Sequence, residues 1–461
     1  MKAVEVGTFP QVRRDFQVTR CNQCADAPCV SACPTQAMYK RDDGIVDFDK
    51  SICIGCKACI AACPYDAIFI NPEDHSAEKC NFCAHRIDMG LEPACAVVCP
   101  VEAILVGDLD DSTSKVSEIV NRDAVSVRRP EKETLPKLFY KGAHQTTLDP
   151  IAARRPAGDT FMWSEMTNGS HIVNSGHPNG ASNSSAAALL AYDVPHSVPW
   201  DWRVSLYTWT KSIAAGVYLV PLLLVLIGEL SWSSDLFKWV APVMAGAFLA
   251  ATGAVLIWDL EHPERFYMIF TRPHWRSWLV RGAIVIGAFG AALAVHFLSS
   301  AIGSVGLRKM VAIAGLPLAI MTAVYTAYLF AQSKARDLWQ SPLLPPHIFV
   351  QAVLAGAAAV FPFAPAAALE ALEWMLAGAA LIHLLLVAGE VTLAHPTAHA
   401  HLAVKEMTRG SYSTFFWMSI ALVAVSMAAP VIGAWAVPAA LVGLLSYEHA
   451  YVQSGQAVPL A

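Results

Sequence analysis

Residues 53–68 read CIGCKACIAACPYDAI. This stretch decides the fold of the amino-terminal part, because its cysteines follow the C-x2-C-x2-C-x3-C-P spacing of a bacterial ferredoxin loop that holds a [4Fe–4S] cluster. Three cysteines on a tight loop can ligate three irons of a cube, and the proline turns the chain away after the fourth. The four ligand positions are Cys53, Cys56, Cys59 and Cys63.

Two similar groups flank this stretch, CNQCADAPCVSACP at residues 21–34 and KCNFCAHRIDMGLEPACAVVCPVEAI at residues 79–104. In paired ferredoxin clusters the fourth cysteine of each run ligates the other cluster. We therefore expect two cubane clusters, one on Cys21, Cys24, Cys29 and Cys63 and the other on Cys33, Cys53, Cys56 and Cys59. The last group offers a third site on Cys80, Cys83, Cys95 and Cys99.

All 12 cysteines fall within residues 21–99, a density that indicates either disulfides or metal. The first 20 residues contain no apolar signal segment, so we expect an unexported domain with reduced thiols and bound metal. Structural zinc is the alternative, because paired C-x2-C units form tetrahedral sites. Zinc explains the first two groups poorly, and it stays open for the third.

The rest of the chain carries few charges. Of the 69 Asp, Glu, Lys and Arg residues, 46 lie in residues 1–204 and 23 in residues 205–461. A helix needs about 20 apolar residues to cross a bilayer, and eight stretches meet that length. We expect an α+β ferredoxin-like iron–sulfur domain followed by an all-α polytopic membrane domain of eight transmembrane helices, at 207–230, 237–258, 278–299, 309–331, 347–365, 370–392, 412–433 and 435–453.

We expect the iron–sulfur domain at residues 1–110, an extended linker at 111–204 and the membrane domain at 205–461. Short apolar runs at 45–48, 67–70 and 103–106 predict small strands. Loops on the amino-terminal side of the spans hold ten Lys and Arg residues against three on the other side. This bias predicts a bacterial inner-membrane protein with the iron–sulfur domain on the cytoplasmic face.

The three cysteine groups resemble those of the four-cluster iron–sulfur subunits of the dimethyl-sulfoxide-reductase superfamily. Three stretches of the second part resemble the NrfD-type (polysulfide-reductase-type) membrane anchor: YTWTKSIAAGVY at 207–218, WDLEHPERFYMIF at 258–270 and YEHAYVQSGQAVPL at 447–460. The resemblance implies a fusion of two subunits that are usually made separately. It also implies [4Fe–4S] clusters, a quinone as substrate, no haem and a molybdopterin-type catalytic partner.

The number of cysteine groups departs from the resemblance. The family has four such groups, and the three found here match its second, third and fourth. Either Cys99 closes a third cluster locally, or a further cysteine group lies upstream, and we favour the upstream group.

Ionisable side chains in membrane spans are rare and by default indicate function. The candidates for quinone contact lie at the expected cytoplasmic ends of the spans, where the resemblance also places the quinone pocket: Tyr207, Lys211, Asp259, Arg265 and Tyr325. Their alternative role is interfacial anchoring. Glu373, His383 and Glu390 are candidates either for a proton path or for a helix interface.

The sequence contains no nucleotide-binding glycine fingerprint and no nucleophile arrangement, so no catalytic residue is assigned. A net charge of −5 without a basic stripe excludes a nucleic-acid binder. We expect an electron-transfer and membrane-anchor subunit that relays electrons between a molybdopterin-type catalytic subunit and the membrane quinone pool. The alternatives are a component of another quinol-oxidising respiratory complex, a transporter with a zinc-ribbon regulatory domain, and an anchor without a working quinone pocket.

Overall fold

The computed structural model describes residues 2–8, 10–149, 151–153, 189–192 and 198–460, and it divides into two compact units. The cysteine unit is the described part of Met1–Cys53, Ala58–Ser197 and Pro459–Ala461. The helical unit is Ile54–Lys57 together with Val198–Val458. The division therefore falls close to the start of the expected membrane domain.

The first two cysteine groups of the cysteine unit fold alike. Each makes a one-turn helix and then an antiparallel hairpin: α1 (Pro28–Ala32) with β3 (Met38–Lys40) and β4 (Val46–Phe48), and α2 (Ala58–Ala62) with β5 (Ile68–Ile70) and β6 (Ala77–Lys79). Cys33, which ends α1, is extended, as expected of a residue before proline. The strands predicted at 45–48 and 67–70 are confirmed, whereas 103–106 contains no strand.

The expected linker is structured over much of its described length. It contains α5 (Lys115–Arg122), β7 (Val125–Ser126), β8 (Tyr140–Lys141) and α6 (Gln145–Leu148). The amide of Ala25 donates to the Leu135 carbonyl at 2.9 Å, and the amide of Lys137 donates to the Asn22 carbonyl at 2.9 Å. These hydrogen bonds attach the segment to the first cysteine group. Residues 154–188 lie outside the described part of the chain.

A three-stranded antiparallel sheet and two short helices complete the cysteine unit. The sheet has the order β2-β1-β9, from β1 (Lys2–Thr8), β2 (Gln11–Gln17) and β9 (Leu189–Tyr192). Val4 and Val6 of β1 are buried. The third cysteine group forms α3 (Ala84–Ile87) and α4 (Ala94–Val97).

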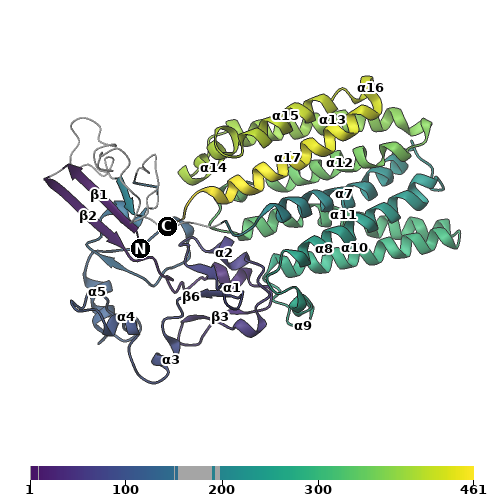
Figure 1. Cartoon of the computed structure of the whole chain (residues 1–461). Coiled ribbons are helices and arrows are strands. Elements are labelled where there is room, and N and C mark those ends of the chain that lie inside the picture. The colour runs from purple at the N-terminus through teal and green to yellow at the C-terminus, as the bar shows by residue number, and fades with distance from the viewer. Residues whose placement is uncertain (1, 9, 150, 154–188, 193–197, 461) are drawn as a thin grey trace. The chain divides into compact units, whose positions relative to one another are not determined.

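Seven helices in the described residues are long and apolar enough to cross a membrane (Figure 1). The predicted span 412–433 becomes α15, whose 14 residues reach about 21 Å at the α-helical rise, short of the roughly 30 Å hydrocarbon core. The rest of the predicted span forms a separate short helix, α16 (Ala429–Ile432). The predicted count of eight spans is therefore not reproduced. The helices of the unit are α7 (Trp202–Leu226), α8 (Ala241–Trp258), α9 (Met268–Thr271), α10 (Trp278–Ala301), α11 (Val305–Gln332), α12 (Leu344–Val360), α13 (Ala366–Thr392), α14 (Ala398–Arg409), α15 (Ser413–Ser426), α16 (Ala429–Ile432) and α17 (Ala436–Ala457).

Helix α7 lies at the centre of the helical unit, where it packs against α8, α11, α12 and α17. In its most apolar stretch 83% of the residues are buried inside the protein, against 22% for α10. Large apolar side chains such as Leu298 and Ile302 are exposed, as expected of surfaces that face lipid. A helix buried on all sides has no solvent face, so each polar side chain on α7 needs a partner inside the unit.

Two glycines allow α7 and α12 to touch through their backbones. A Cβ atom built on Gly216 would overlap the Ala352 carbonyl oxygen and lie 2.8 Å from the Cα of Gly356. A Cβ built on Gly356 would likewise overlap the backbone of Gly216. Small residues at such crossings let membrane helices approach closely.

We therefore expect Gly216→Ala to destabilise the helical unit by about 1–3 kcal/mol, the usual effect of overpacking a tight contact. The measurement is the thermal unfolding midpoint of the protein in detergent. Gly287→Ala on α10 is the matched control, because nothing lies within 4 Å of its added Cβ. Equal midpoints for the two variants would contradict this account of the crossing.

Candidate functional site

The thiols of the first two cysteine groups are largely buried, and four of them interact with one another. Cys29 has Cys63, Cys21 and Cys24 as electrostatic neighbours. Burial raises the pKa of Cys63 to about 12 and that of Cys24 to about 11. The structure thus brings together cysteines from two groups that are about 30 residues apart in the sequence. Thiols held in the neutral form by burial release protons when metal binds them as thiolates.

Cys33 and Cys53 form a second association of the same kind, because each is an electrostatic neighbour of the other. The Met38 amide donates to the sulfur of Cys33 at 3.3 Å, and the Ala77 amide donates to the sulfur of Cys53 at 3.5 Å. Amide donors of this type stabilise the negative charge of a cluster ligand and adjust the cluster potential. The donor set is therefore what an iron–sulfur cluster requires.

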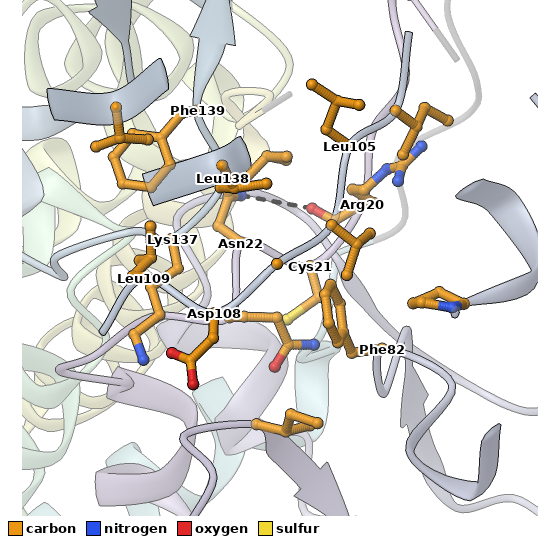
Figure 2. A pocket seen from close by; sticks show the side chains of 18 of the residues that line it. Arg20, Cys21, Asn22, Phe82, Leu105, Asp108, Leu109, Lys137, Leu138 and Phe139 are labelled. Atoms are coloured by element: carbon orange, nitrogen blue, oxygen red, sulfur yellow. Dashed lines mark hydrogen bonds between the residues drawn. The ribbon is translucent and has the colours of Figure 1, made fainter. Parts of the chain in front are cut away.

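The third cysteine group is more open. Cys80, Cys83 and Cys95 line a cavity of about 790 Å³, whose other lining residues include Cys21, Phe82 and Leu105 (Figure 2). Cys80 and Cys95 are exposed. A guanidinium nitrogen of Arg20 lies 3.5 Å from the sulfur of Cys95. Three of the four thiols of this group therefore face one space.

Cys99 is not among the described residues that line this cavity. Its sulfur accepts a hydrogen bond from the Ala103 amide at 3.2 Å. The backbone amides of Ile104 and Ala103 lower the pKa of the Cys99 thiol. Cys99 precedes a proline and receives amide hydrogen bonds, as Cys33 does, so its surroundings are those of a cluster ligand.

The loop Ile54–Lys57, which carries Cys56, belongs to the helical unit. The Trp200 indole donates to the Cys56 carbonyl at 3.1 Å. A Cβ on Gly55, whose φ is +68°, would overlap the side chain of Glu261. Only glycine therefore fits at this close approach.

Lys211 is fully buried in α7. Its ammonium donates to the Ala323 carbonyl at 2.6 Å and to the Thr326 hydroxyl at 2.8 Å, and it lies 5.1 Å from the centre of the Tyr325 ring. Its charged partner is Glu448 of α17. An unpaired charge is costly in a membrane-spanning segment, and these four groups compensate it.

Tyr207 lies beside the same residues. It hydrogen-bonds to Thr326 and interacts electrostatically with Tyr325, Asp259 and Glu448. We call Tyr207, Lys211, Tyr325, Thr326 and Glu448 the Lys211 centre. Three of its members were predicted from the sequence, while Thr326 and Glu448 were missed. Glu448 was detectable in principle, because it is the one Asp, Glu, Lys or Arg residue after Arg409 in the sequence.

The two remaining candidates for quinone contact follow α8. Asp259 is buried, and the loss of solvent raises its pKa to about 6, although Lys57 opposes this. The Lys57 ammonium lies 2.9 Å from Glu261 and donates to the Asp259 carbonyl at 3.3 Å. Arg265 lies in the following turn, where it pairs with Glu264 at 3.7 Å. Asp259 therefore borders Tyr207, whereas Arg265 pairs with a neighbour on its own turn.

A second set of buried polar side chains joins α12, α13 and α17. Tyr447 donates to Glu390 at 2.6 Å, His347 lies 2.9 Å from the other oxygen of Glu390, and the second ring nitrogen of His347 lies 2.9 Å from His383. We call these four residues the Glu390 chain. His383 and Glu390 were predicted together with Glu373, but His347 and Tyr447 were missed because the sequence does not show that α12 and α17 bring them to Glu390. Glu373 is half-buried on the same helix.

No three or more His, Cys, Asp or Glu side chains within the described ranges are grouped closely enough to hold one metal ion. A cubane cluster keeps its four thiolates farther apart than a single ion does.

The comparisons with known proteins agree with this arrangement. Residues 12–109 match the family described as 4Fe-4S dicluster domain. Residues 193–445, more than half of the chain, match the family described as Polysulphide reductase, NrfD. The chain belongs to the NrfD family. The predicted combination of an iron–sulfur domain with an NrfD-type membrane domain is therefore confirmed.

Curated relatives match the amino-terminal part. A tetrathionate reductase subunit of Salmonella typhimurium is 44% identical over 149 residues, which are 32% of this chain and 58% of that protein. A polysulfide reductase chain of Wolinella succinogenes is 44% identical over 120 residues, or 26% and 63%. The arsenate respiratory reductase iron-sulfur subunit ArrB of Shewanella sp. is 37% identical over 186 residues, or 30% and 80%. The chain spans less than two thirds of the length of the first two.

Because Cys63 is an electrostatic neighbour of Cys29, we predict which cysteine variants lose the same cluster signal. We expect Cys63→Ser and Cys29→Ser to lose the same signal from the EPR spectrum of the dithionite-reduced protein. Cys33→Ser and Cys53→Ser should together lose a different signal.

Each of the four variants should retain the signal that the other pair loses, which serves as the internal control. If Cys63→Ser instead shares its loss with Cys53→Ser, each group holds its own cluster and the exchange of fourth ligands is wrong.

Proposed function

We propose that this chain transfers electrons between a membrane quinone and a catalytic partner subunit. The observation that carries the proposal is the Lys211 centre, a buried cation surrounded by hydroxyl groups and a carboxylate, in a chain that also carries ferredoxin-type cysteine groups. The names of the relatives support it, since one is a tetrathionate reductase subunit and another is an arsenate respiratory reductase iron-sulfur subunit. The partner that we propose is a molybdopterin oxidoreductase.

We assign one [4Fe–4S] cluster to Cys21, Cys24, Cys29 and Cys63, and a second to Cys33, Cys53, Cys56 and Cys59. When bound, each cluster accepts and passes on one electron at a time. The amides of Met38 and Ala77 support the thiolate charge on Cys33 and Cys53. Burial of Cys29 and Cys63 keeps water from the sulfur atoms.

The quinone is the substrate of the Lys211 centre in this proposal. The ammonium of Lys211 uses two of its three N–H bonds on Ala323 and Thr326, and the third remains for a quinone oxygen. A fixed cation stabilises the negative charge that develops on that oxygen as electrons arrive. Tyr207 and Tyr325 supply further hydroxyl donors, and Glu448 is a nearby proton acceptor.

The family match and the apolar helices show that this is a multi-pass membrane protein. We further propose the bacterial inner membrane, with the cysteine unit on the cytoplasmic side. The excess of Lys and Arg in the loops of the amino-terminal side supports this orientation.

Iron content tests the cluster assignment. We expect about 8 irons and 8 acid-labile sulfides per purified chain, as two [4Fe–4S] clusters. The third group should stay empty in the isolated chain, because Cys99 is not among the residues that line the cavity shared by Cys80, Cys83 and Cys95. About 12 irons would mean that Cys99 completes a third cluster, and zinc without iron would end the electron-transfer proposal.

A single-turnover experiment tests the quinone site. Dithionite-reduced protein, freed of excess reductant, is mixed anaerobically with decylubiquinone or menadione, and reoxidation is followed by cluster absorbance. We expect Lys211→Met to slow reoxidation by at least about 100-fold, because the charge on the quinone oxygen loses its cation.

Lys309→Met is the matched control, because Lys309 is an exposed lysine near the start of α11. Iron content must be the same in both variants. Unchanged reoxidation in Lys211→Met, or no reoxidation of the wild type by either quinone, would refute the assignment of the site.

A further inference from the structure

The Glu390 chain is a continuous line of hydrogen bonds between ionisable side chains. The described contacts run from Tyr447 to Glu390, from Glu390 to His347 and from His347 to His383, at 2.6, 2.9 and 2.9 Å. His347 and His383 have no exposed surface, and Glu390 has 5%. Apolar side chains of similar size would fill the same space without the free-energy cost of removing polar groups from water. A purely structural role therefore explains the Glu390 chain poorly.

The hydrogen bonds define how protons are arranged along the line. Tyr447 and the Nδ1–H of His347 donate to the two oxygens of an ionised Glu390. The Nε2 of His347 is then an acceptor, and it receives the Nδ1–H of His383. This leaves the Nε2 of His383 as a buried lone pair, and that atom has no hydrogen-bond partner in the described structure.

This arrangement can take up one proton by shifts along existing hydrogen bonds. A proton that binds Nε2 of His383 releases the Nδ1 proton of that ring to Nε2 of His347. His347 in turn releases its Nδ1 proton to Glu390. Both imidazoles end neutral with their tautomers exchanged, Glu390 ends as a carboxylic acid, and one proton has been gained.

The charges next to the chain favour such uptake. Glu390 interacts electrostatically with Tyr451 and with Glu448 of α17, and with His395 beyond α13. Glu448 also interacts with His347 and Lys211. With both carboxylates ionised and Lys211 protonated, the two connected sets carry a net charge of −1, and one proton brings them to zero.

We propose that the Glu390 chain stores a proton for the Lys211 centre. It supplies one of the two protons that a quinone takes up with two electrons from the clusters, and it takes one back when a quinol is oxidised. We assign the transfer between the two sets to Glu448, a member of the Lys211 centre that interacts electrostatically with both His347 and Glu390. The inference rests on the proposed quinone reaction, and it adds a residue set that need not touch the quinone.

Infrared difference spectroscopy tests the storage step directly. Reduced-minus-oxidised spectra of the purified protein with decylubiquinone should contain a carboxylic-acid carbonyl band that shifts in D2O. The band should be absent in Glu390→Gln and retained in Glu373→Gln, a matched change on the same helix. His383→Gln, which keeps the size and polarity of the side chain but cannot relay a proton, should lose the band as well.

The single-turnover experiment supplies the second measurement. We expect Glu390→Gln and His383→Gln to slow reoxidation by decylubiquinone at least tenfold at saturation. The half-saturating quinone concentration should stay unchanged, unlike in a variant that loses a quinone contact. The iron content of each variant shows that it has folded and loaded its clusters.

The outcomes separate the two proposals. If the wild type reacts with the quinone while both variants keep its rate and its carbonyl band, the storage role is wrong and the proposed function stands. If the wild type reacts with neither quinone, the proposed function is refuted, and the storage role is refuted with it.

Discussion

The buried ammonium of Lys211 is the constraint around which the helical unit is built. A cation inside a lipid-spanning bundle must be compensated within a few ångströms. The Ala323 carbonyl and the Thr326 hydroxyl on α11 accept hydrogen bonds from it, and Glu448 on α17 adds an electrostatic attraction. Three helices are therefore fixed relative to one another by one charge. A buried charge adds little stability compared with apolar packing, so the burial of Lys211 indicates chemistry.

Much of this organisation could be predicted from the sequence, because the signals are local. Cysteine spacing identified the metal-binding groups, and long apolar runs identified most of the spans. The seventh predicted span is not reproduced as one helix, because hydropathy does not register a turn: residues 412–433 are mostly apolar, yet the helix ends at Ser426. The secondary structure within the expected linker was not predicted, because hydrogen bonds such as that from Lys137 to Asn22 join residues far apart in the sequence.

In the candidate site, too, some residues could be predicted from their position in the sequence and others only from helix packing. Lys211, Tyr207 and Tyr325 were predicted from their place near the ends of apolar runs. Glu448 and His347 were not, because their partners lie on other helices and the sequence does not show which helices meet. The partners come from other helices, and helix packing is what the sequence pattern leaves open. The exchange of fourth ligands, in contrast, is a prediction from local spacing, and Cys63 is an electrostatic neighbour of Cys29 as that prediction requires.

The polar side chains at the opposite end of the bundle differ from the Lys211 centre and the Glu390 chain. There Arg308 donates to the Ser300 hydroxyl and to the Trp232 carbonyl, and Tyr218 pairs with His296. The partners of Arg308 are a neutral hydroxyl and a neutral carbonyl, and the Tyr218–His296 pair likewise contains no carboxylate. Glu390 and Glu448 instead lie near the end of α13 and in the second half of α17, close to where α7 begins. Both carboxylates therefore lie on the side of the bundle that holds the buried Lys211, as the proposed uptake of a proton with electron transfer to a quinone requires.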